Sequence, residues 1–101
     1  MIRVPTHRIP THPGEMLVEE FLNPMNITCQ ELSAAIHMPS QYIEDVVEAR
    51  TELTPSTALR LSRYFGNSVD FWISLQVRWD LYHAQKRESA TLELIQPRQL
   101  A

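Results

Sequence analysis

Glycine and cysteine are scarce in this chain of 101 residues, and each shortage argues against a class of structure or site. Two glycines are few for a turn-rich β fold or a glycine-rich phosphate loop. The single cysteine, Cys29, can form no intrachain disulfide and cannot supply a four-thiolate zinc site. The length favours one domain, and a hydrophobic content of 44% is sufficient for one compact core.

Long apolar runs are missing as well. No stretch approaches the roughly 18 apolar residues of a transmembrane helix, and the N-terminal segment lacks the apolar core of a secretory signal. We therefore expect a cytoplasmic protein. The four histidines are dispersed without a metal-binding spacing such as H-E-x-x-H, and no nucleophile motif is visible. The sequence predicts no metal site, no cofactor and no enzymatic activity.

Positive charge is in short supply. Nine Lys and Arg stand against twelve Asp and Glu, the net charge is −3, and Lys86 is the only lysine. A strongly basic balance would have favoured nucleic-acid binding directly. Any DNA-binding surface on this chain must therefore be a local patch or be formed by dimerisation.

Prolines separate an N-terminal arm from the first predicted helix. Residues 1–11 are expected to be an extended arm, because Pro5 and Pro10 interrupt any helix. Pro13 suits the first helical position, since its missing N–H would be unpaired there anyway, and Asn23-Pro24 is expected to end that helix.

The segment from Thr28 to Arg50 predicts two short helices joined by a tight turn. Thr28 and Glu31 form a capping box, in which each side chain accepts a hydrogen bond from the other residue's amide. His37-Met38-Pro39 breaks this helix, and Ser40 is the expected cap of the next one. Two short amphipathic helices separated by about three or four residues are typical of a helix-turn-helix motif.

Two further helices are predicted in the second half. Thr54-Pro55 begins the fourth, which carries Arg60 and Arg63 as phosphate contacts or as a solvated face, and Gly66 ends it. Ser68 is expected to cap the fifth, on which apolar residues recur at helical spacing. Part of this stripe extends past a four-helix core, which predicts a homodimer interface. The residues predicted at this interface are Leu75, Trp79 and Tyr82.

A short C-terminal tail is expected over residues 89–101. Its segment Leu92-Glu93-Leu94-Ile95 is apolar enough to add a short strand or to pack against the core, and Pro97 ends any regular element.

Three motifs in order carry a family resemblance. They are H-P-G-E-M-L with E-F-L within residues 12–22, L-T-P-S-T-A-L-R-L-S-R-Y-F-G at 53–66, and D-F-W-I-S-L-Q at 70–76 followed by Asp80-Leu81. Together they resemble the HigA antitoxins, also called virulence-associated protein I. The resemblance implies an all-α, five-helix, lambda-repressor-like domain over residues 12–88 with a C-terminal helical extension. It also implies a homodimer that binds double-stranded operator DNA, represses its own operon and neutralises a RelE-like mRNA endonuclease toxin.

Candidate DNA contacts follow from how helix-turn-helix proteins dock. The second helix of the motif enters the major groove with its N-terminal residues, while the start of the preceding helix commonly holds phosphate. Gln can bond an adenine edge in two places, Asp can accept from cytosine, and Tyr can reach a phosphate or a thymine methyl. The predicted contacts are Thr28, Gln30, Ser40, Gln41, Tyr42, Asp45 and Arg50.

The charge of the expected recognition helix supports a second hypothesis. Glu44, Asp45 and Glu48 stand against Arg50 alone, and phosphates repel carboxylates. Ala49 occupies a position where the family usually has a glycine, which leaves room for a different helix end. The alternative is therefore a HigA-like protein-interaction module whose DNA binding is weak or lost.

Overall fold

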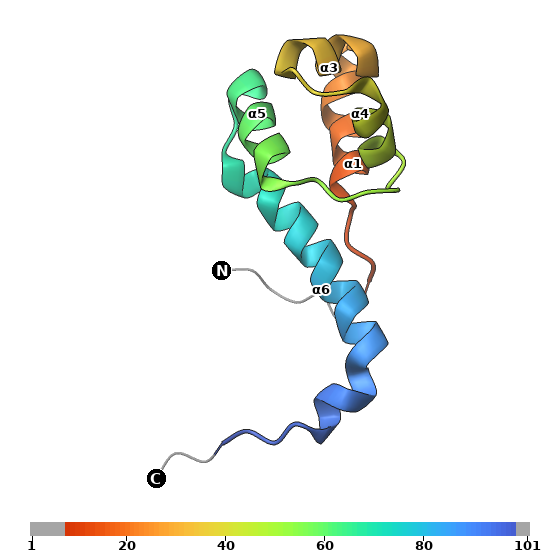
Figure 1. Cartoon of the computed structure of the whole chain (residues 1–101), viewed down its shortest axis with the longest axis vertical. Coiled ribbons are helices and arrows are strands. Elements are labelled where there is room, and N and C mark those ends of the chain that lie inside the picture. Colours follow the sequence, from red (N-terminus) through yellow and green to blue (C-terminus); the bar gives the residue numbers. More distant parts are fainter. Residues whose placement is uncertain (1–7, 99–101) are drawn as a thin grey trace.

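The computed structural model describes residues 8–98, and its regular structure there is entirely helical (Figure 1). The elements are α1 (Pro13–Leu17), the π-helical turn η1 (Val18–Leu22), α2 (Asn23–Met25), α3 (Cys29–Ile36), α4 (Ser40–Val47), α5 (Pro55–Phe65) and α6 (Val69–Leu94). Because α1, η1 and α2 run on without a break, the described part of the chain has five helices, and the all-α prediction is confirmed. Most of the predicted arm, residues 1–7, and the last residues of the tail, 99–101, lie outside this range.

The first helix continues through Pro24, which was expected to end it. A proline inside an α-helix removes one hydrogen bond and crowds the carbonyl four residues earlier. The π-helical turn η1 precedes it, and there the Asn23 amide donates to the Val18 carbonyl in a wider ring. The helix ends where Asn26 adopts a left-handed conformation with φ 56° and the Ile27 amide donates to Leu22 O over 2.9 Å.

Most predicted helix starts are confirmed. The Thr28–Glu31 capping box is complete, with both hydrogen bonds 3.0 Å long, and Thr54 and Ser68 accept from the third amide of their helices. The expected cap at Ser40 is wrong. Pro39 holds the extended N-cap position, with φ −62° and ψ 136°, so Ser40 is already the first helical residue and makes no capping bond.

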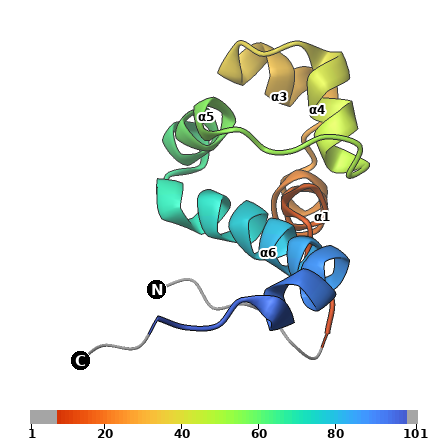
Figure 2. The ribbon, with the colours of Figure 1, turned by 60° about the horizontal axis from the view of Figure 1, so that its bottom comes forward.

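The core lies where α1, α4, α5 and α6 converge, and Figure 2 looks along α1 with α4 on one side and α6 on the other. Leu17, Ile43, Leu61 and Trp72 are fully buried there. Gly14 allows α1 to approach α4 closely, because a methyl group at that position would overlap the Val46 carbonyl. The packing of α1 on α4 holds the inner face of α4 against the rest of the domain.

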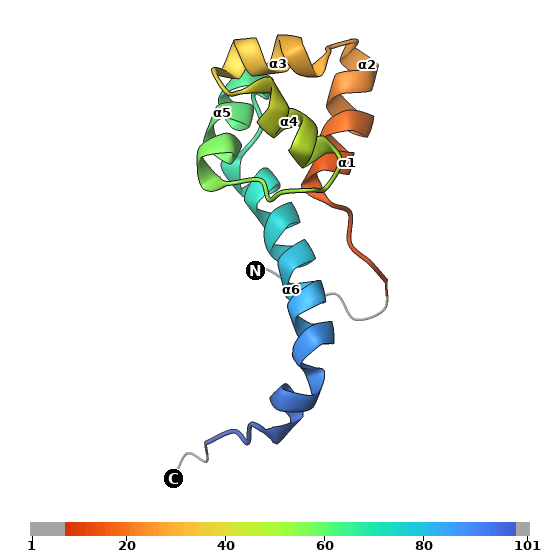
Figure 3. The ribbon, with the colours of Figure 1, turned by 45° about the vertical axis from the view of Figure 1, so that its right-hand side comes forward.

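The long helix α6 begins in the core and leaves it (Figures 1 and 3). Its first turns pack on α5 and α1, while its last turns extend away from the other helices. The expected strand or core contact at 92–95 is wrong, since the helix runs to Leu94 and Leu92, Leu94 and Ile95 are 44%, 80% and 65% exposed. Within residues 8–98, no helix is long and apolar enough to cross a membrane.

Candidate nucleic-acid interface

The turn between α3 and α4 is held by backbone bonds and by a side chain from α5. His37 closes α3 in a left-handed conformation with φ 58°, and the Met38 amide donates to Ser33 O. Arg60 donates from Nη1 to the carbonyls of Ile36 and His37 over 2.9 and 2.7 Å. The guanidinium thus caps the C-terminal end of α3, a long-range role that the sequence did not indicate. By holding this end of α3, it fixes the direction in which α4 departs. The turn between the two helices is visible in Figure 3.

The leading end of α4 is exposed. Ile43 and Val46 face the core and are buried, while Ser40, Gln41 and Glu44 lie on the outer face of the same helix. These three exposed side chains of the eight-residue helix are available to a partner. This is the placement that groove insertion requires of a recognition helix.

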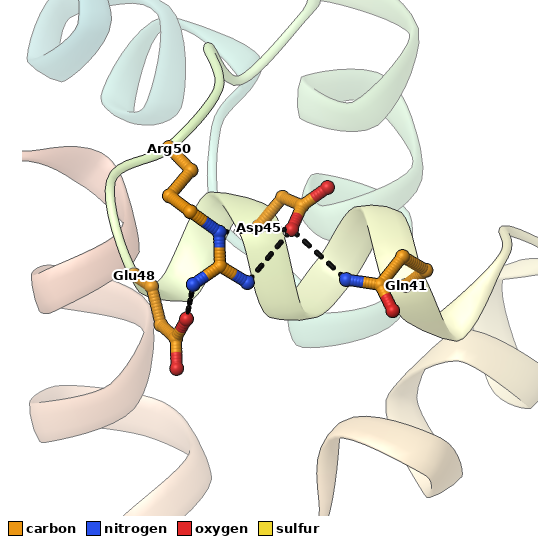
Figure 4. Close-up of polar contacts among 4 residues, drawn as sticks. All are labelled: Gln41, Asp45, Glu48 and Arg50. Carbon is orange, nitrogen blue, oxygen red and sulfur yellow. Dashed lines mark hydrogen bonds and ion pairs between the residues drawn. The ribbon is translucent and has the colours of Figure 1, made fainter.

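Three of the predicted contact residues form one network on that face (Figure 4). The Gln41 amide donates from Nε2 to Asp45 Oδ1 over 3.0 Å, and Arg50 donates from Nε and Nη2 to the same oxygen over 3.2 and 2.9 Å. Arg50 Nη1 also pairs with Glu48 Oε2. The single arginine therefore compensates two of the three acidic side chains, and Glu44 takes part in no ion pair among residues 8–98.

The hydrogen bond from Arg50, and then the one from Gln41, hold the pKa of Asp45 below its usual value of 3.8. The carboxylate thus remains ionised and acts only as an acceptor near neutral pH.

The end of α4 directs Arg50 back over this helix. Ala49 adopts φ 59°, its amide donates to Val46 O over 3.0 Å, and the Arg50 amide donates to Asp45 O over 2.8 Å. These bonds form a Schellman motif, which usually has glycine at the left-handed residue. The different helix end suggested by Ala49 is therefore not observed: alanine takes the left-handed conformation despite its side chain.

Tyr42 points away from the expected groove-reading face. Its hydroxyl donates to the Glu52 carbonyl over 3.0 Å, lies 2.8 Å from Thr57 Oγ1 and accepts from the Thr54 amide over 3.2 Å. The ring is half-buried and ties α4 to the start of α5. Its hydroxyl is thus occupied within the protein, whereas Ser40 and Gln41 keep exposed polar groups.

The two residues that open α3 differ in how their polar groups are used. The Thr28 hydroxyl accepts the Glu31 amide, so it serves as the helix cap. Gln30 is exposed on the first turn. Both lie on the helix that precedes α4, on the exposed surface of the chain.

The residues expected at a dimer interface do not share one surface. Leu75 is 6% exposed and belongs to the core of its own chain. Trp79 and Tyr82 are half-buried one and two turns further along α6, and Tyr82 receives Lys86, whose Nζ lies 5.3 Å from the ring centroid. Only the part of the stripe beyond Leu75 presents substantial area to another molecule.

Two polar residues with structural roles are buried behind the motif. His12 caps α1, because its Nδ1 accepts the Gly14 amide over 2.9 Å, and burial lowers its pKa from 6.5. Gln76 of α6 accepts the Leu53 amide over 2.8 Å and donates to Asp80 over 2.9 Å, which secures the segment after α4. For the capping role of His12, the available sequence signal was its position directly before Pro13 at the start of the first helix.

Comparison with known proteins identifies relatives over most of the chain. Virulence-associated protein I of Dichelobacter nodosus is 37% identical over 86 residues, which cover 85% of this chain and 79% of that protein. Antitoxin HigA-1 of Vibrio cholerae is 32% identical over 92 residues, or 91% of this chain and 87% of that one. The solved structure of the Pseudomonas aeruginosa antitoxin HigA with the higBA promoter matches with a TM-score of 0.83 at 32% identity, covering 90% of this chain and 99% of that chain. No protein-family model matches the chain.

Proposed function

Because the chain belongs to the family of HigA antitoxins and virulence-associated protein I, we propose that it is a DNA-binding antitoxin that represses its own operon and neutralises a partner toxin. The observation that carries this proposal is the exposed outer face of α4 at the end of a motif whose helices and turn are firmly held. A relative of similar fold has been solved with its promoter DNA, which supports the same use of this motif.

The proposed DNA contacts fall into two groups, those to base edges and those to phosphate. Ser40 and Gln41 stand at the leading end of α4 and are assigned to base edges. Thr28 and Gln30, at the start of α3, are assigned to phosphate, as is Arg50 at the far end of α4. Tyr42 is assigned a supporting role, since its hydroxyl bonds hold α4 against α5.

A homodimer gives the protein two such helices. We assign Trp79 and Tyr82 to the contact between two copies, because aromatic side chains that remain half exposed on a helix are favoured at interfaces. A two-fold dimer places its recognition helices about 34 Å apart, one turn of the duplex, and therefore requires a nearly palindromic operator.

The relatives are antitoxins and helix-turn-helix regulators, and we propose that this protein likewise acts by binding alone, without catalysis, in the cytoplasm where its operator lies.

A salt titration of the dimer on the duplex that precedes its own gene tests the proposal. Contacts to phosphate release counterions, so the logarithm of the affinity should fall linearly with the logarithm of salt concentration, and an unrelated duplex should bind more weakly at every salt. Absence of saturable binding, both by the dimer and by its complex with the toxin, would leave the protein-interaction module as the remaining function. Glu44, which takes part in no ion pair in the described part of the chain, and the excess of acid on α4 favour that module as the second candidate.

A further inference from the structure

We propose that Asp45 is a positioning residue for base recognition: it orients the amide of Gln41 so that Gln41 reads adenine, while Arg50 compensates its charge. This inference rests on the proposed DNA-binding function and specifies the chemistry of the same site. It concerns which base is preferred and which side chain sets that preference.

The bond between Gln41 and Asp45 orients the glutamine amide. An exposed glutamine is free to turn either its oxygen or its nitrogen toward a neighbour. An ionised carboxylate only accepts, so the bond of 3.0 Å from Gln41 Nε2 to Asp45 Oδ1 turns the nitrogen end toward Asp45. Gln41 is left with its Oε1 acceptor and one N–H donor side by side, on a side chain that is exposed at the leading end of α4 (Figure 4).

This acceptor and donor on Gln41 match one base better than the other purine. In the major groove adenine presents a donor, N6–H, beside an acceptor, N7. Gln41 Oε1 can accept from N6 while its remaining N–H donates to N7. Guanine presents acceptors at both N7 and O6, so the same orientation would set Oε1 against O6. Fixing the amide therefore favours adenine over guanine.

Arg50 allows the Asp45 carboxylate to be tolerated near DNA. Arg50 donates two hydrogen bonds to the Asp45 oxygen that also receives Gln41, and the left-handed Ala49 returns the chain to bring Arg50 there. The pair faces solvent, with the Arg50 side chain 54% and the Asp45 side chain 32% exposed. The arginine reduces the repulsion between Asp45 and phosphate without removing the acceptor that Gln41 needs.

Selection of binding sites from a randomised duplex library tests this assignment. The wild-type chain should select one adenine in each half-site and disfavour guanine there by roughly 5- to 150-fold, the range of one bidentate contact. Gln41→Ala and Asp45→Ala should each reduce that ratio toward one. Asp45→Asn, which keeps an acceptor oxygen but can also turn its amide, should retain part of the preference.

Affinity for unrelated DNA separates positioning from a merely structural role. Asp45→Ala removes a negative charge, so its affinity for a non-specific duplex should stay equal or rise while base preference is lost. The matched control is Glu44→Gln, which removes a neighbouring exposed charge with no ion pair among the described residues and should leave the adenine preference intact. A structural defect would lower both kinds of binding.

The inference is overturned if Asp45→Ala keeps the adenine preference unchanged. It is also overturned if Asp45→Ala loses a preference for cytosine and not for adenine, because Asp45 would then contact a base itself. Either result leaves the proposed function standing. If the wild-type chain selects no sequence at all, the proposed function fails and this assignment fails with it.

Discussion

His12 and Trp79 meet at right angles, with ring centroids 4.9 Å apart and an interplanar angle of 89°. His12 caps the first helix and Trp79 lies midway along α6. One edge-to-face contact therefore connects the start of the domain to the helix that carries the proposed dimer contacts.

The protonation of His12 should make stability depend on pH. Its pKa is lowered by burial, although the nearby Asp80 and Glu15 act in the opposite direction. Below its ordinary pKa of 6.5 the unfolded chain takes up this proton more readily than the folded chain. The stabilising contribution of neutral His12 to the free energy of unfolding is complete above pH 6.5, and it declines as the pH falls through the lowered pKa. Urea melts between pH 7.5 and 5 measure the slope.

His12→Asn should flatten that slope, because asparagine also caps helices but does not titrate. The comparison variant is His37→Asn, an exposed residue in a left-handed conformation that asparagine tolerates, which should retain the part of the slope due to His12. Equal slopes in wild type and His12→Asn would mean that the imidazole contributes nothing.

Ala49→Gly should stabilise the protein by about 0.5–1 kcal/mol. A left-handed alanine costs about 1–2 kcal/mol, and the greater freedom of glycine in the unfolded chain offsets part of the gain. The same exchange inside α3, Ala34→Gly, should cost about 0.5–1 kcal/mol, because Ala34 is an exposed residue in a regular helix. Chemical denaturation gives both values, and a loss of stability in Ala49→Gly would contradict the conformation assigned to the end of α4.

Tyr42→Phe should destabilise the domain by about 1–2 kcal/mol, because it removes a hydroxyl bonded to Glu52, Thr54 and Thr57. Base preference in the library selection should be unchanged, as the hydroxyl faces the protein. Tyr64→Phe is the matched control: Tyr64 is 45% exposed and its hydroxyl makes no hydrogen bond within residues 8–98, so its effect should be near zero. Full stability with lost DNA affinity in Tyr42→Phe would assign the hydroxyl to the phosphate instead.

Tyr82→Ala should weaken dimerisation at least tenfold, since aromatic anchors supply much of the energy of an interface. Trp79→Ala should weaken it too, with an added loss of stability from its His12 contact. Sedimentation velocity over a range of concentrations measures the effect, with exposed Arg78→Ala as the control on the same helix. An unchanged dissociation constant for both aromatic variants would remove this part of α6 from the interface.

What the sequence predicted correctly depends mostly on neighbours in the chain. The caps at Thr28, Thr54 and Ser68 need only a side chain and an amide three residues later, so local order was sufficient to find them. The helix-turn-helix was visible because two short apolar patterns stand on either side of Pro39.

What the sequence missed depends on packing between distant segments. Tyr42 and Leu75 have residue types that suit DNA and dimer contacts, and the sequence did not indicate that they also pack against α5 and the core. The role of Arg60 in capping α3 spans more than twenty residues and leaves no local pattern. The pairing of Arg50 with Asp45 and Glu48 depends on the left-handed turn at Ala49, a conformation that the sequence pattern did not indicate.

If the leading end of α4 reads the operator, the loss of its two exposed polar side chains should reduce affinity for the operator in particular. Fluorescence anisotropy at one salt concentration would measure the dissociation constant of wild type and of the double variant Ser40→Ala with Gln41→Ala, after equal thermal melts establish that both are folded. We predict a loss of at least about tenfold for the operator and little change for an unrelated duplex. Equal operator affinity in the two proteins would mean that the leading end of α4 does not read the operator.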